Sequence, residues 1–167
     1  MENAKEQNTT PGTTDQESAV IVAAVDTSPR GGRIVEIAAR LARRNYESAV
    51  LHIVHVFKSS WMGQHKVDGL SIDQMMDEGR RYLDYHVRVA RRQCSAEVIG
   101  HFVLGEPVDE IVRLADGVHA DLVLIGAQDS IGAMERLLVG TVTENVVRRV
   151  HCTVMVVRSK EKAPRRE

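Results

Sequence analysis

The segment 122–147 contains the residues whose types and spacing best suit ligand binding. An apolar run ends at Gly126, a polar stretch follows, and Gly140 precedes Thr141 at the start of an expected helix. Main-chain amides at such a junction, together with the helix dipole, suit a phosphate or another anion. Glycines there let a ligand approach the main chain closely. A second interpretation stays open: Gly126 only turns the chain, and Thr141 forms a capping box with Glu144.

Asp26 is the other residue placed for chemistry, because it directly follows the apolar run 19–25. Its carboxylate suits ribose hydroxyls, an adenine amine or a metal; alternatively, it caps the next helix or bonds to nearby amides. His52 and His55 lie three apart on an expected strand, so their side chains leave opposite faces and share no metal. His55 either lies near a ligand or is a structural histidine, and Trp61 either anchors a loop or contacts a partner.

Motifs of the common enzyme classes are missing from the sequence. It has no GxSxG elbow, no P-loop, and no GxGxxG after the first apolar run. Cys94 and Cys152 have no metal-ligand spacing, and neither do the histidines. We therefore assign no catalytic residue and no metal ligand.

Alternating apolar runs and amphipathic stretches predict the elements that position these residues. Ser28 and Pro29 are expected to open the first helix, and Ser71 with Gln74 to cap the second. An irregular segment is expected at 58–70. We expect strands at 19–25, 49–57, 97–103, 122–125 and 153–158, and later helices at 72–93, 108–118 and 142–150.

This alternation is typical of a parallel sheet with right-handed crossovers in a three-layer α/β sandwich. Ligands of such folds lie beyond the carboxyl ends of the strands. We expect one domain at 18–158, with disordered tails at 1–17 and 159–167. The formal net charge of −1 and the absence of a long apolar run argue against nucleic-acid and membrane partners. The polar start of the chain lacks a signal-peptide pattern, which favours a cytoplasmic protein.

From about residue 19 to 158, the chain resembles the universal stress protein family. The resemblance lies in AVDTS, LHIVHV, GEPVDEIVRLA, ADLVLIG and above all LLVGTVTENVVRRVHCTVMVVR. It implies a five-stranded parallel sheet in the order 3-2-1-4-5, an α/β/α sandwich of the adenine-nucleotide α-hydrolase-like kind. It also implies a homodimer that pairs through the exposed last strand, Thr153–Val157, where an apolar edge invites pairing.

The family resemblance further implies a binding site for ATP, ADP or AMP, with or without Mg²⁺ or Mn²⁺. Asp26 would face the adenosine, the Val56 main chain the adenine, and Gly126 the ribose. Amides and a hydroxyl near the start of the last helix would hold the phosphates. The full set implied is Ala24, Asp26, Val56, Gly126, Ser130, Gly140, Thr141 and Val142.

One departure from the family's Gly-x2-Gly-x9-Gly-Ser/Thr signature affects this site. The spacing from Gly126 to Gly140 is one residue longer, so Ser130 stands at the second glycine's position, beside Asp129. Asp129 would repel phosphate unless a divalent cation lay between them. Three hypotheses follow: a nucleotide-binding stress regulator with at most slow ATP hydrolysis, a nucleotide-free interaction module, and an enzyme related by fold. The last lacks the SGGxDS loop expected of adenylating relatives.

Overall fold

The computed structural model describes residues 18–28, 30–45, 48–62, 70–127 and 141–158. The strands are β1 (Ser18–Val25), β2 (Ser48–Lys58), β3 (Glu97–Gly105), β4 (Leu122–Gly126) and β5 (Thr153–Val157). The helices are α1 (Arg30–Asn45), α2 (Ile72–Gln93), α3 (Pro107–Gly117) and α4 (Thr141–Arg149), with a short 3-10 helix, η1 (Ser59–Trp61), after β2.

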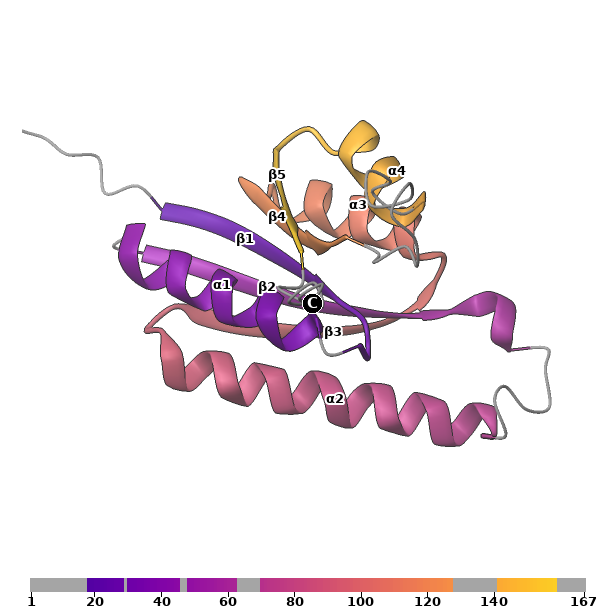
Figure 1. Ribbon diagram of the computed structural model, residues 1–167. Helices are drawn as coiled ribbons and strands as arrows, with labels where there is room; N and C mark the ends of the chain where they lie inside the picture. The colour runs from indigo at the N-terminus through magenta and orange to yellow at the C-terminus, as the bar shows by residue number, and fades with distance from the viewer. Residues whose placement is uncertain (1–17, 29, 46–47, 63–69, 128–140, 159–167) are drawn as a thin grey trace, which may run out of the picture.

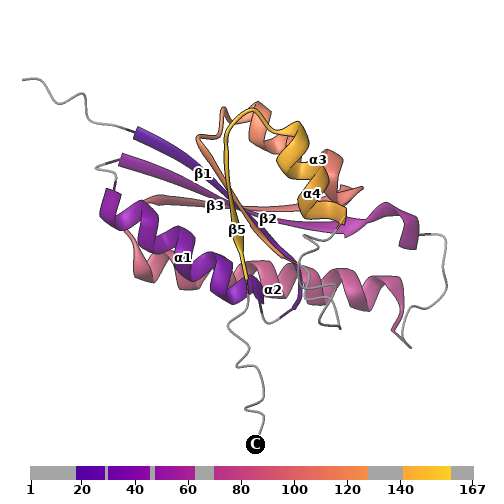
Figure 2. The same cartoon turned by 45° about the horizontal axis from the view of Figure 1, so that its top comes forward.

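The strands form one parallel sheet in the order β3-β2-β1-β4-β5. Helices α1 and α2 cover one face and α3 and α4 cover the other (Figures 1 and 2). The predicted order and the three-layer architecture are therefore confirmed. Strand order reverses at β1, whose neighbours are β2 and β4, so this is where a ligand crevice is expected.

Strand β1 is buried on both faces because a helical layer lies on each side of it. Ile21, Ala23 and Val25 belong to the core cluster beneath α1 and α2, whereas Val22 and Ala24 belong to the cluster beneath α3 and α4. This alternation follows the two-residue period of a strand. Full burial of each valine or isoleucine stabilises the fold by about 1.5–3 kcal/mol, so the sheet's centre is a rigid support for the residues at its end.

Helix α2 begins and ends where the sequence predicts. The Ser71 hydroxyl accepts a hydrogen bond from the Gln74 amide at 3.3 Å, and the Gln74 side chain accepts one from the Ser71 amide at 2.9 Å, which confirms the capping box. Within the helix, Gly79 allows close approach to the sheet. A Cβ there would lie 2.9 Å from both His55 Nε2 and Phe102 Cε2.

The other predicted elements are confirmed with ends moved by one or two residues, but one expectation needs correction. The segment 58–70 is not wholly irregular, because β2 continues through Lys58 and η1 follows. At the start of α2, Met75 is only partly buried and lines a cavity. Both predicted tails lie outside the described residues. Within the described ranges, no helix is long and apolar enough to cross a bilayer.

Candidate functional site

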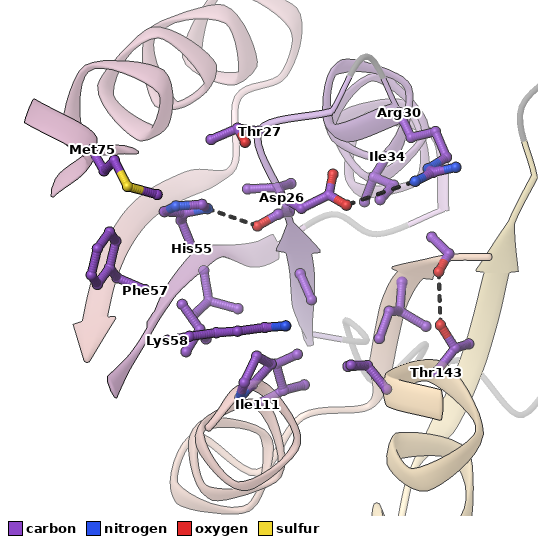
Figure 3. Close-up of a pocket in the computed structure, with 18 of the residues that line it drawn as sticks. Asp26, Thr27, Arg30, Ile34, His55, Phe57, Lys58, Met75, Ile111 and Thr143 are labelled. Atoms are coloured by element: carbon purple, nitrogen blue, oxygen red, sulfur yellow. Dashed lines mark hydrogen bonds and ion pairs between the residues drawn. The ribbon is translucent and has the colours of Figure 1, made fainter. Parts of the chain in front are cut away.

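A cavity of about 580 Å³ lies beyond the carboxyl ends of β1, β2 and β4. Its size falls within the range of about 300–1,000 Å³ that is usual for small-molecule sites. The starts of α1 and α4 flank it at the point where the strand order reverses, and Ile111 of α3 lies opposite Asp26 (Figure 3). The position is the one that the α/β fold predicts for a ligand.

Asp26 lies at the mouth of this cavity, and its side chain is 63% exposed. One carboxylate oxygen accepts hydrogen bonds from the Ser28 amide, at 3.1 Å, and from the Ser28 hydroxyl. The other oxygen lies 3.9 Å from the Arg30 guanidinium. Both interpretations of Asp26 thus have support, because the carboxylate stabilises the turn into α1 and also faces the cavity. The Ser28 hydroxyl in turn accepts from the Arg30 amide at 3.4 Å, in the capping role predicted for it.

Tyr82 supports this turn from α2. Its hydroxyl donates a hydrogen bond to the Ser28 carbonyl at 3.1 Å. Burial, and secondarily the nearby Asp26 carboxylate, raise the pKa of Tyr82 to about 12, so the phenol keeps its proton. Sequence reasoning missed this contact. The sequence feature that relates to this contact is Gly31, because a Cβ at that position would collide with the Tyr82 hydroxyl.

His55 at the end of β2 is buried, and it lines the cavity. Its Nδ1 donates a hydrogen bond to the Val25 carbonyl at 3.0 Å. Burial lowers the pKa of His55, and the Val25 carbonyl and Asp26 oppose that shift only in part. His55 therefore has a structural role, because its neutral imidazole joins β2 to β1. It also lies beside the site.

The side of the cavity formed by β4 and α4 contains Gly126, Val142 and Thr143. The Thr143 hydroxyl donates to the Gly126 carbonyl at 2.7 Å, which fixes the start of α4 against the end of β4 (Figure 3). Sequence reasoning did not assign this role to Thr143. The capping-box interpretation fits less well, since Thr141 is already the first residue of α4 and the Glu144 carboxylate pairs with Arg148.

Apolar side chains dominate the opposite side of the cavity, next to the end of β2. The Trp61 ring packs edge-on against Phe57, with centroids 5.4 Å apart, and the Lys58 ammonium stands 5.7 Å from the Trp61 centroid. Met75, from α2, closes this end. These contacts favour the anchoring interpretation of Trp61.

The structure brings most of the predicted site residues together. Ala24, Asp26, Val56, Gly126 and Val142 all line the cavity, although they come from three different strands, one helix and, for Asp26, the turn after β1. Thr141 lies one residue before Val142, at the exposed first position of α4. Ser130 and Gly140, along with Asp129, lie outside the described residues.

Metal-binding side chains do not gather in the part of the chain that the structure describes. No group of three or more histidine, cysteine, aspartate or glutamate side chains there is arranged to hold an ion. Two carboxylates, Asp26 and Glu78, line the cavity together with the cations Arg30 and Lys58. The cations Arg30 and Lys58 suit an anionic ligand, and the carboxylates of Asp26 and Glu78 suit hydroxyl groups on that ligand.

Comparison with known proteins identifies the family of the chain. The model of the universal stress protein family matches residues 18–158. A universal stress protein of Staphylococcus aureus strain USA300 is 32% identical over 143 residues, which is 84% of each chain.

Solved structures show the same fold. The universal stress protein of Archaeoglobus fulgidus has a TM-score of 0.65 and 28% identity over 83% of this chain and 92% of its own. A structure of the universal stress protein from that organism in complex with dAMP has a TM-score of 0.59 and 23% identity, over 84% and 98% respectively. On its sequence match and its fold, the chain belongs to the universal stress protein family.

Proposed function

We propose that this protein is an adenine-nucleotide-binding regulator of the stress response. The observation that carries the proposal is the convergence of Ala24, Asp26, Val56, Gly126 and Val142 on one cavity at the reversal point of the sheet. The dAMP complex of the Archaeoglobus relative supports the same ligand class.

The described residues fit such a ligand. Asp26 is exposed and lines the cavity, and it suits ribose hydroxyls or an adenine amine. Val56 also lines the cavity, and its main chain is proposed to meet the adenine edge. Gly126 has no Cβ, so the ribose that we propose to lie beside it can approach its main chain closely. Val142 and Thr143, near the start of α4, line the same space, and the amides and dipole at a helix start suit an anion.

The phosphate end of the proposed site includes Ser130, Gly140 and Thr141 as donors, and Mg²⁺ or Mn²⁺ would offset the charge of Asp129. ATP, ADP and AMP all fit this scheme. We propose binding rather than turnover as the function, because the sequence has no motif that supplies a base to activate water.

The regulatory role requires that the bound state be communicated to other proteins. We propose that the protein acts in the cytoplasm as a homodimer that pairs through β5, with partner proteins that the chain does not identify. We propose that the domain responsible spans residues 18–158, with tails at 1–17 and 159–167.

Thermal unfolding with and without Mg-ATP tests the proposal. A ligand at about 100 times its dissociation constant adds about 2.7 kcal/mol to the free energy of unfolding. For a chain of this size, the melting temperature should rise by roughly 5–10 °C. Asp26→Ala and Gly140→Val should each abolish the rise, and the site is misplaced if both variants still respond.

A nucleotide-free interaction module of the same fold is the second candidate. It is favoured by the partners that Asp26 already has, since Ser28 and Arg30 both contact its carboxylate. This candidate predicts no melting shift with ATP, ADP or AMP at millimolar concentration.

A further inference from the structure

We propose that Arg30 recognises the phosphate groups of the nucleotide by their charge. When the ligand binds, Arg30 exchanges its ion pair with Asp26 for one with the phosphates. The inference rests on the proposed adenine-nucleotide site. It adds a specificity-determining residue that neither the sequence pattern nor the family resemblance assigns.

Arg30 lies on the side of the cavity where the phosphates are proposed to bind. It is the first residue of α1, and a Cβ placed on Gly126 would lie 3.9 Å from both Cδ and Nε of its side chain. The arginine therefore lies against the side of Gly126 that a Cβ would occupy, at the end of β4. Phosphates that extend from a ribose beside Gly126 toward the start of α4 would lie within reach of the guanidinium.

The side chain is held in this position before any ligand arrives. It is only 21% exposed, in contrast to the 63% of Asp26. Ile34 packs beside it, and Ile34 Cδ1 lies 3.4 Å from the position that a Cβ on Gly126 would occupy. An arginine already fixed by packing loses little conformational entropy when it binds, and its planar fork matches two phosphate oxygens.

The contact with Asp26 is suited to exchange. At 3.9 Å, it is at the outer limit of an ion pair, and the carboxylate is largely in water. Such pairs contribute little to stability. A guanidinium–phosphate pair is stronger because it is charge-assisted and can be bidentate. Release of Asp26 from Arg30 also frees a carboxylate oxygen to accept from a ribose hydroxyl, so the two halves of the nucleotide bind cooperatively.

The cavity's other lining cation among the described residues is Lys58, and it lies at the far end. Its ammonium stands 5.7 Å from the Trp61 ring centroid, next to the end of β2 where the adenine is proposed. Among the residues that the structure describes, the positive charge beside Gly126 therefore comes from Arg30. Affinity should rise from adenosine to AMP, ADP and ATP.

Isothermal titration calorimetry of the full chain with adenosine, AMP, ADP and Mg-ATP tests this role. The test variant is Arg30→Gln. The matched control is Arg33→Gln on the same helix, whose guanidinium pairs with Glu36 on the exposed side, outside the cavity. Loss of hydrogen bonds to a charged group should weaken ATP binding by about 10- to 100-fold in Arg30→Gln. Adenosine affinity should stay the same or increase, and Arg33→Gln should match the wild type.

The outcomes separate the role of Arg30 from the proposed function. If the wild type binds none of the four ligands, the nucleotide site and the inference both fall. If the wild type binds ATP and Arg30→Gln binds it equally well, only the role of Arg30 is overturned. An equal loss for ATP and adenosine also overturns it, because that result indicates a structural effect without phosphate recognition.

Discussion

The hydroxyl of Tyr82 on α2 donates a hydrogen bond to the carbonyl of Ser28, 3.1 Å away, in the turn that follows β1. Ser28 in turn donates from its amide and its hydroxyl to the Asp26 carboxylate. The position of Asp26 at the cavity mouth is therefore supported from a helix that lies more than fifty residues along the chain. Tyr82 acts as a positioning residue for the proposed site.

Tyr82→Phe should weaken nucleotide binding without removing it. Loss of one hydrogen bond costs about 1 kcal/mol, which lowers the melting temperature of a chain this size by roughly 2–4 °C. We expect a several-fold increase in the dissociation constant for ATP, measured by calorimetry below the melting temperature. Tyr85→Phe is the control, since that side chain is 57% exposed and should change neither value. An unchanged dissociation constant for ATP in Tyr82→Phe would show that Tyr82 does not position the nucleotide site.

Gly79→Ala should destabilise the fold although alanine favours helices. Its Cβ would lie 2.9 Å from both His55 Nε2 and Phe102 Cε2, so α2 or both rings would have to move. Overpacking of this kind costs typically about 1–3 kcal/mol. Gly117→Ala in α3 is the matched control, because nothing lies within 4 Å of its Cβ position. Urea denaturation should show a loss for the first variant and none for the second; equal midpoints would contradict the close approach of α2.

The fold should lose stability as the pH falls below about 6.5, the usual pKa of histidine in an unfolded chain. Burial lowers the pKa of each of His52, His55, His86 and His101 in the folded protein. The unfolded chain therefore takes up protons first, so the stabilisation is complete above pH 6.5 and is lost as the pH falls toward the folded-state values.

His52 and His101 make a specific contribution to this effect. Their nitrogens lie 2.8 Å apart, so one ring must donate to a neutral acceptor, and protonation of both rings breaks the bond. The double variant His52→Gln/His101→Gln should flatten the fall in unfolding free energy between pH 7.5 and 5.5. His151→Gln, at an exposed position, serves as the control. A slope equal to that of the wild type would show that the pair does not contribute.

Much of the fold was predictable because its signals are local. The apolar runs at 19–25 and 49–57 predicted buried strands, and the capping-box pattern of Ser71 and Gln74 predicted the start of α2. The site was predicted less completely, because its remaining contacts depend on tertiary structure. Tyr82 and Ser28, or Arg30 and Gly126, meet only once the layers have packed, and no spacing in the sequence indicates such a contact.

Proline at Val156 should separate the proposed dimer and leave the fold intact. In a parallel pair, alternate residues bond to the neighbouring strand, and Thr153 and Val157 both bond to the β4 side. The amides of Val154 and Val156 therefore point outward from the edge, where proline removes a donor that β4 does not use. Sedimentation equilibrium should give a dimer mass for the wild type and for Val156→Ala, and a monomer mass for Val156→Pro. A wild-type monomer at micromolar concentration would contradict the dimer.

A crystal structure of the protein grown with saturating Mg-ATP is the most direct test of the central claim, that the cavity between β1 and β4 binds an adenine nucleotide. We expect adenosine density between Asp26 and Val56, with the ribose beside Gly126 and the phosphates at the start of α4, within reach of Arg30. An empty cavity, or one filled by the protein's own side chains at that concentration, would contradict it.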